Sequence, residues 1–205
     1  MKDFTDYLCA PGFSKMRQGA KILLEGLAEV FPSIDLRNEN FTKTPYRIAK
    51  AYLEMCYGCG AKEDVKSILD TSFPAQYDGM VIIDNISAYS LCPHHFLPVA
   101  YRIDFGYIPK KRALGLSKIP RFISVLARQP ILQEDLTKEI IKLFTKYVSP
   151  KGCIVVLHGV HNCIQCRGAN QNNAACVTSE ISGVFKEAST RSEFFEALKI
   201  QSMRS

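Results

Sequence analysis

The sequence has no long apolar run. Its most apolar stretches, "GMVII" over residues 79–83 and "CIVVL" over residues 153–157, are far shorter than a bilayer-spanning helix, which needs about 20 apolar residues. The first residues, "MKDFTDYLCAPGFSKMRQG", are acidic and polar where a secretory signal needs a continuous apolar stretch. We therefore expect no membrane segment and a cytoplasmic location.

A strong excess of charge is also missing. The net charge of +6 is modest for 205 residues and is spread along the chain, so it does not point to nucleic acid, although it suits an anionic ligand. A chain of this length with 47% hydrophobic residues can bury a sizeable core without disulfides. We expect its eight cysteines to be reduced, some as metal ligands and others as small buried residues.

The sequence contains no internal repeat, low-complexity tract or long linker. Apolar spacing and cap residues predict helices, with Thr44 and Pro45 opening the second, Ser117 capping the third and Ser189 capping the last. These helices cover residues 14–31, 42–58, 115–130, 131–150 and 189–200. Alternating β-branched and aromatic residues predict strands over 80–90, 97–109, 152–164 and 174–185.

The order of these elements predicts the fold class. Antiparallel strands interrupted by a helical pair are typical of an α+β fold, not of an alternating parallel one. We expect an N-terminal helical portion over residues 1–72 and a main domain over residues 73–205.

All four histidines lie in two short segments that also contain cysteine. The first, "LCPHHFLPV" over residues 91–99, carries Cys92, His94 and His95. The second is "LHGVHNCIQCRG" over residues 157–168. Cysteine and histidine are the preferred ligands of zinc, so this distribution predicts one metal site built from both segments.

Cys92 and His95 are three residues apart across Pro93, which can start a helical turn. Their side chains can therefore converge, whereas the adjacent His94 is expected to point elsewhere. Zinc needs further ligands, because a catalytic site uses three protein ligands and an open position, and a structural site uses four protein ligands.

The second segment leaves two ways to complete the site. If it is a strand, His161 and Cys163 share one face, while His158 and Cys166 lie on the other. Cys163 alone would leave an open position, whereas Cys163 with Cys166 would make a closed structural site. Spacing leaves both possibilities open, but the additional imidazoles of His94 and His161 favour catalysis, since they carry protons near neutral pH.

The chain resembles the GTP cyclohydrolase I family over most of its length. The resemblance rests on "TPYRIAK", "CPHH", "YIPKKRALGLSKIPR", "LQEDLT", "VHNCIQCRG" and "GVFKEASTRSEFF", in this order. It implies the tunnelling fold, in which antiparallel sheets of several subunits join into a barrel with helices outside. It also implies a homo-oligomer, a decamer, with active sites between subunits, and residues 73–205 as the catalytic domain.

The resemblance further implies an activity: hydrolysis of GTP to formate and 7,8-dihydroneopterin triphosphate, the first step of folate and pterin synthesis. Zinc would sit on Cys92, His95 and Cys163, and its water would attack carbon 8 of guanine. His94 and His161 would transfer protons.

The resemblance also assigns residues to the nucleotide. Glu134 matches the guanine-binding glutamate, where a carboxylate can accept two parallel N–H bonds, and Gln133 is a further contact. The triphosphate would be bound by Ser117, Lys118, Arg121, Arg167, Arg47 and Lys50, the last two across a subunit interface.

Two positions depart from the family pattern. Pro93 stands where the family commonly has an acidic residue, and Cys166 could enter the zinc site or form a disulfide with Cys163. The alternatives are therefore a relative that opens the purine ring but releases another product, and a non-catalytic protein with a structural zinc.

Overall fold

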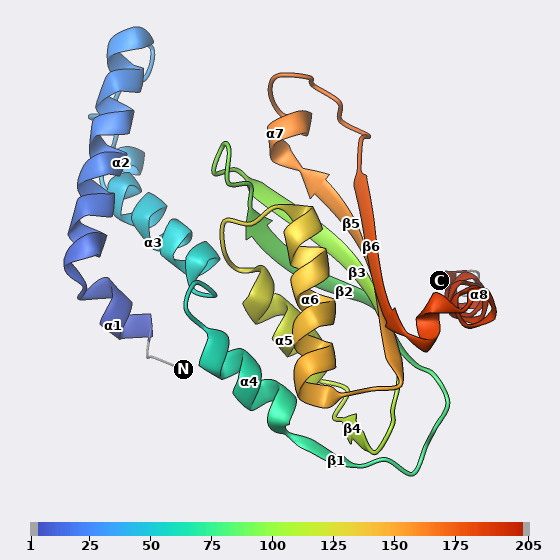
Figure 1. Cartoon of the computed structure of the whole chain (residues 1–205). Coiled ribbons are helices and arrows are strands. Elements are labelled where there is room, and N and C mark those ends of the chain that lie inside the picture. Colours follow the sequence, from blue (N-terminus) through green and yellow to red (C-terminus); the bar gives the residue numbers. More distant parts are fainter. Residues whose placement is uncertain (1–3, 203–205) are drawn as a thin grey trace. The chain divides into compact units, whose positions relative to one another are not determined.

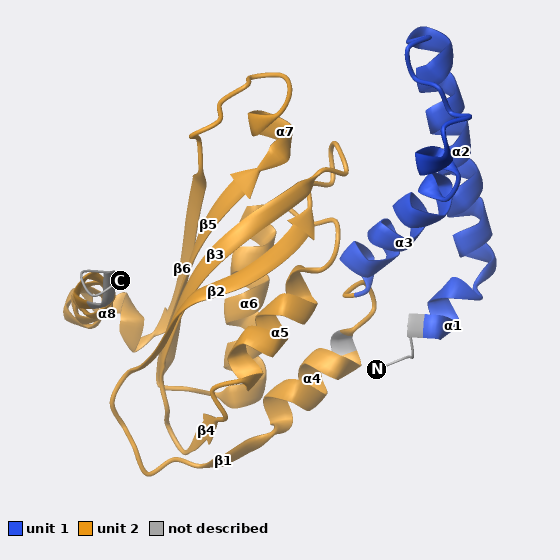
Figure 2. Ribbon diagram, turned by 180° about the vertical axis from the view of Figure 1, so that it is seen from behind, with its two compact units in different colours: residues 1–57 blue, residues 58–205 orange. Residues whose placement is uncertain are grey.

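The computed structural model describes residues 4–202 and divides the chain into two compact units, residues 1–57 and residues 58–205 (Figure 2). The first unit contains α1 (Phe4–Leu8), α2 (Pro11–Val30), the short 3-10 helix η1 (Glu39–Phe41) and α3 (Thr44–Cys56). The helices predicted from apolar spacing correspond to α2 and α3, which pack on one another. Within residues 4–202, no helix combines the length and apolar character needed to span a membrane.

The predicted cap of α3 is wrong in detail. Thr44 is already the first helical residue and Lys43 holds the cap position, while the Thr44 hydroxyl donates to the carbonyl of Asn40 at 3.3 Å. Pro45 stands in the first turn as predicted, where its missing N–H costs nothing. Phe13 of α2 packs edge-on against Tyr46, with ring centroids 5.5 Å apart.

The second unit is built on a four-stranded antiparallel sheet with the order β2-β3-β5-β6. A small sheet pairs β1 with β4. The strands are β1 (Ser72–Pro74), β2 (Val81–Leu91), β3 (Pro98–Ile108), β4 (Arg112–Leu114), β5 (Gly152–His161) and β6 (Cys176–Gly183). The helices are α4 (Lys62–Asp70), α5 (Lys118–Ala127), α6 (Gln133–Val148), α7 (Asn162–Gln165), η2 (Val184–Lys186) and α8 (Ala188–Ser202). The predicted α+β class, with an antiparallel sheet and a helical pair, is confirmed.

The helical pair α5 and α6 covers one face of the sheet (Figure 1). Alternate residues of β3 point to this face, and Phe105 and Tyr107 pack against Phe144 of α6, with ring centroids 4.8 and 5.2 Å apart. Neighbouring residues point to the opposite face, where Ile154 packs in a buried cluster with Phe194 of α8. The two faces of the sheet are therefore covered by different helices, α5 and α6 on one face and α8 on the other.

Three predicted details of the second unit differ from the structure. The strand predicted over 152–164 ends at His161, and the chain continues as α7. Ser189 is not a cap, because α8 already begins at Ala188. Ser117 does occupy the cap position of α5, but its side chain makes no capping hydrogen bond.

Helix α4 was not predicted from the sequence. Its buried residues Val65 and Leu69 pack with α5 and α6, so the compact second unit begins at Gly58. The division of the chain into a helical portion over 1–72 and a catalytic domain over 73–205 stays a prediction.

Candidate metal centre

The first histidine segment forms a short loop between β2 and β3. Leu91 pairs with Pro98, which closes the hairpin. Inside it, the Cys92 N–H donates to the Leu97 carbonyl at 2.9 Å and the Phe96 N–H donates to the Cys92 carbonyl at 2.8 Å. Phe96 has a φ of 53°, a left-handed conformation that tightens the turn. The loop thus holds Cys92 and His95 close together, as their spacing predicted.

The second segment reaches this loop through the pairing of β3 with β5. Val99, just after the loop, lies opposite His161, the last residue of β5. The chain then turns into α7, and the Asn162 side chain donates to the Pro98 carbonyl at 2.9 Å. This bond ties the start of α7 to the start of β3 and places Cys163 beside the loop.

Cys92, His95 and Cys163 form a group that can hold a metal ion. Their ligand atoms all lie within 4.8 Å of one another, with Cys92 buried, Cys163 half-buried and His95 exposed. Two sulfurs and one imidazole nitrogen suit zinc or another soft divalent metal. Burial and the neighbouring Cys92 raise the pKa of the Cys163 thiol, whereas the charge of Arg167 lowers it. A bound cation would favour the thiolate that ligation needs.

His94 lies differently from what spacing suggested, and Cys166 lies outside the metal group. The Nδ1 atoms of His94 and His95 both lie 3.9 Å from the Cys92 sulfur, because the tight turn wraps both residues around it. His94 has therefore not turned away, although it does not belong to the metal group. The exposed Cys166 donates to the Asn162 carbonyl at 3.0 Å and also lies outside that group. The geometry thus favours the three-residue site over the closed one.

His161 points to the helix-covered face, where it meets Gln133 in the first turn of α6. Its Nε2 lies 2.9 Å from the Gln133 carboxamide oxygen. His158 points to the opposite face, beside Asp104, as strand alternation predicted. Burial lowers the pKa of His161, and the charge of Glu134 acts against this shift. The environment therefore favours a neutral imidazole beside the metal group.

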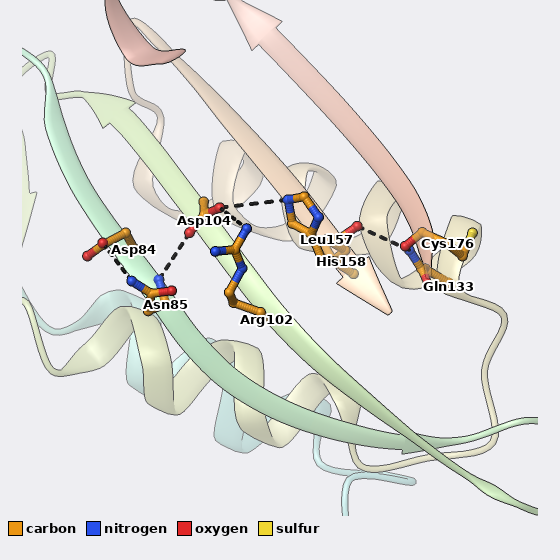
Figure 3. A network of polar contacts seen from close by, with 8 residues as sticks. All are labelled: Asp84, Asn85, Arg102, Asp104, Gln133, Leu157, His158 and Cys176. Atoms are coloured by element: carbon orange, nitrogen blue, oxygen red, sulfur yellow. Dashed lines mark hydrogen bonds and ion pairs between the residues drawn. The ribbon is translucent and has the colours of Figure 1, made fainter. Parts of the chain in front are cut away.

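Gln133 is 1% exposed, and protein atoms surround its side chain. Its Nε2 donates to the carbonyls of Leu157 and Cys176, at 3.2 and 3.0 Å (Figure 3). A direct contact between Gln133 and a nucleotide therefore stays a prediction. Glu134, the next residue, is exposed. Burial raises the pKa of the Cys176 thiol, and the negative charge of Glu134 adds to this shift. The two adjacent residues thus have distinct settings, one enclosed and one open to a ligand.

The other predicted nucleotide contacts are not gathered around the metal group. Arg167 follows α7 and lies close to Cys163 of the metal group. By contrast, Ser117, Lys118 and Arg121 stand at the start of α5. The chain enters α5 from β4, where the Leu114 N–H donates to the Tyr107 hydroxyl near the far end of β3. The metal loop adjoins the other end of that strand, about 30 Å away at roughly 3.3 Å per residue. Figure 1 shows α7 and β4 at opposite ends of the sheet.

The last two predicted contacts, Arg47 and Lys50, belong to α3 of the first unit. The Lys50 ammonium lies 3.8 Å from the Glu54 carboxylate on the same helix. Their role in binding the triphosphate stays a prediction.

Sequence reasoning missed three residues around His161. Tyr101 of β3 bonds the Ser90 hydroxyl at 2.8 Å, and burial raises the pKa of Tyr101 to about 12. Thr178 of β6 bonds the Gln133 amide at 3.0 Å, and Gly159 leaves room for that amide. Only Gly159 carried a signal, because a glycine inside a strand often marks a close approach of another group.

Comparison with known proteins places these residues in a family. Residues 25–199 match the family model described as GTP cyclohydrolase I. The chain is 39% identical to GTP cyclohydrolase 1 of Campylobacter curvus over 166 residues, which cover 80% of this chain and 86% of the relative. The corresponding protein of Campylobacter lari is 39% identical over 183 residues, covering 88% and 93%.

Among solved structures, the apo form of the archaeosine synthase QueF-Like is similar at a TM-score of 0.44 and 16% identity, over 53% of this chain and 97% of that one. The family model spans the metal group, both catalytic-histidine candidates and Glu134, and the relatives are matched over most of their length. The chain therefore belongs to the GTP cyclohydrolase I family, a family of enzymes.

Proposed function

We propose that this protein is a zinc enzyme that converts GTP to formate and 7,8-dihydroneopterin triphosphate. The observation that carries the proposal is the group of Cys92, His95 and Cys163, which lies beside His161. A structural zinc would need neither a neighbouring neutral imidazole nor an exposed carboxylate such as Glu134. Both suit a reaction that binds a purine and moves protons.

Each residue has a chemical task in this proposal. Cys92, His95 and Cys163 would hold zinc, leaving one position open. When bound, zinc supplies Lewis acidity and lowers the pKa of water at that position to about 7. The Glu134 carboxylate accepts N–H bonds from the guanine edge and so fixes the base. His94 and His161 move protons at their ring nitrogens as the imidazole ring of the purine opens.

We further propose that the active sites form between subunits of a homo-oligomer, a decamer. The separation within one chain between the metal loop and the cationic start of α5 supports this arrangement. Lys118 and Arg121 lie in the first turn of α5, where their positive charges and the helix dipole suit phosphate oxygens. A neighbouring subunit could bring such an end to the metal loop, whereas the same chain would have to span the length of β3.

The experiment incubates zinc-loaded protein with GTP and measures formate and, after oxidation, neopterin fluorescence. Both products support the proposal. Formate without a pterin indicates a different product, and neither product, with one zinc held per chain, indicates a structural site. We expect His94→Ala and His161→Ala to retain zinc and lose turnover.

Cys163→Ala and Cys166→Ala form a matched pair for the ligand assignment. Cys163 lies in α7 and Cys166 directly after it, but of the two only Cys163 belongs to the metal group. We expect Cys163→Ala to lose zinc and activity, and Cys166→Ala to retain both. Full zinc content in Cys163→Ala, measured by elemental analysis after dialysis, contradicts the assignment.

A further inference from the structure

The carboxamide of Gln133 has a defined orientation. Its Nε2 lies 3.2 Å from the Leu157 carbonyl and 3.0 Å from the Cys176 carbonyl, and carbonyl oxygens can only accept. If the amide were turned over, its oxygen would face both carbonyls. Three oxygens that can only accept would then lie together without a hydrogen between them. The NH2 group therefore faces β5 and β6, and the oxygen faces His161 (Figure 3 shows Gln133 beside Leu157 and Cys176).

Two threonines reinforce this orientation. The Thr137 hydroxyl donates to the Gln133 backbone carbonyl at 2.7 Å, so its oxygen must accept from the Thr178 hydroxyl, also at 2.7 Å. Thr178 has then used its hydrogen, and its lone pair accepts from the Gln133 Nε2 at 3.0 Å. The bonds form a closed ring whose donor and acceptor directions follow from the backbone carbonyls, with the two amide hydrogens shared among three acceptors.

The direction of the ring determines where the His161 proton lies. The Gln133 oxygen can only accept, and it lies 2.9 Å from the His161 Nε2. That nitrogen must therefore carry the hydrogen, which leaves the lone pair of a neutral imidazole on Nδ1.

Gly159 provides an independent observation. A Cβ at this position would lie 2.0 Å from the Gln133 carboxamide oxygen and 3.0 Å from the Tyr101 ring. The β5 strand around it is otherwise rich in β-branched and large apolar residues. The missing side chain makes space for the acceptor that His161 uses, two residues further along the same strand face.

We propose that Gln133 is a positioning residue that holds His161 in the tautomer with its proton on Nε2, so that Nδ1 is the nitrogen available to the substrate. The catalytic consequence rests on the function proposed above, but the tautomer itself does not. Gln133 then acts through His161 and needs no contact with the nucleotide. Gly159 serves the same purpose, because it leaves space for the Gln133 oxygen.

The test is 15N magic-angle-spinning NMR of histidine-labelled, zinc-loaded protein, with His161 assigned by the loss of its signals in His161→Asn. We expect a protonated Nε2 and an unprotonated Nδ1 in the wild type. In Gln133→Met, which keeps the side-chain length but removes the acceptor, we expect the Nδ1–H tautomer to be populated. We also expect kcat to fall roughly ten- to hundredfold with KM little changed, by analogy with the loss of hydrogen-bond partners of metal-ligating side chains.

Gln129→Met is the matched control, since the Gln129 amide donates to the Leu126 carbonyl in its own turn, at 2.7 Å. It should leave the His161 spectrum and kcat unchanged. If Gln133→Met does not fold, Gly159→Ala tests the same acceptor by displacing it. A wild-type His161 protonated on Nδ1, or a tautomer unchanged in both folded variants, overturns the proposal. Wild-type protein that makes no formate but shows the Nε2–H tautomer refutes the proposed function alone.

Discussion

Asp104 accepts the hydrogen bond that holds a bulge in β2, and removing this acceptor should destabilise the second unit. Its Oδ1 accepts from the Asn85 N–H at 3.0 Å. Asn85 lies where the register between β2 and β3 shifts, and it has a φ of 53°. The carboxylate therefore replaces a ladder partner that the bulge has removed, in a conformation that a residue other than glycine adopts at some cost.

The ion pairs of Asp104 are expected to contribute less to stability than its hydrogen bond. Its Oδ2 lies 3.9 Å from the Arg102 guanidinium and 4.0 Å from the His158 ring (Figure 3). The Asp104 side chain is 8% exposed, but those of Arg102 and His158 are 57% and 33% exposed. Exposed pairs at such distances contribute about 0–1 kcal/mol, whereas a hydrogen bond to a charged group contributes about 1.5–3 kcal/mol.

The comparison between Asp104→Asn and Asp104→Ala separates these contributions. Asparagine retains an acceptor for Asn85 and loses the charge, so we expect a loss of under about 1 kcal/mol in the free energy of unfolding. Alanine removes the acceptor, and we expect a loss of about 1.5–3 kcal/mol. At about 2–4 °C per kcal/mol for a chain of this size, thermal melting resolves the difference. If both variants melt equally early, the ion pairs dominate and the reasoning about the bulge is wrong.

Three further predictions concern buried groups. Tyr101, with a pKa of about 12, should keep its proton above pH 10, where the unfolded chain loses it, so stability should fall between pH 10 and 12 and fall less steeply in Tyr101→Phe. The buried Cys153, whose thiol pKa is raised by burial, should resist alkylation in the native protein while the exposed Cys166 reacts, as mass spectrometry of digested protein can measure. Phe194→Ala should lower the free energy of unfolding measured with urea by about 3–5 kcal/mol, because this fully buried ring packs with Ile154. Phe195→Ala should lower it much less, because Phe195 is 43% exposed.

The fold was predictable where periodicity is long and one-sided. The spacing of apolar residues predicted α5 and α6, each of which buries an apolar stripe against neighbouring elements. It also predicted α2 and α3, which pack on one another although Ile22, Leu23 and Val30 of α2 are exposed. Helix α4 was missed because its sequence, "KEDVKSILD", is only nine residues long, although Val65, Ile68 and Leu69 have helical spacing and are buried. The end of β5 was missed because "NCI" continues an acceptable alternation, whereas the turn into α7 is held by tertiary bonds such as that from Asn162 to the Pro98 carbonyl.

The role of Gln133 could not be predicted from its neighbours in the chain. Glutamine at the start of a helix is usually exposed, and "LQEDL" gives no local sign that this one is 1% exposed. Its burial depends on Gly159 and Thr178, which come from two different strands. Such a setting is a property of tertiary contacts, so sequence reasoning assigned the residue to the substrate instead.

The metal centre follows from the register of the sheet. Residues 92–97 lie more than sixty positions from Cys163 in the chain, yet pairing Val99 with His161 places the two segments at the same end of adjacent strands. A slip of one residue would reverse the faces of β5, turning His161 away from Gln133 and burying His158 under α6. Val155 and Leu157 are buried beneath the helical pair, and Ile154 and Val156 are buried on the opposite face, so a slip would force side chains of different shape into both packed layers. The packing of β5 on its two faces therefore helps to determine which histidine meets the metal loop.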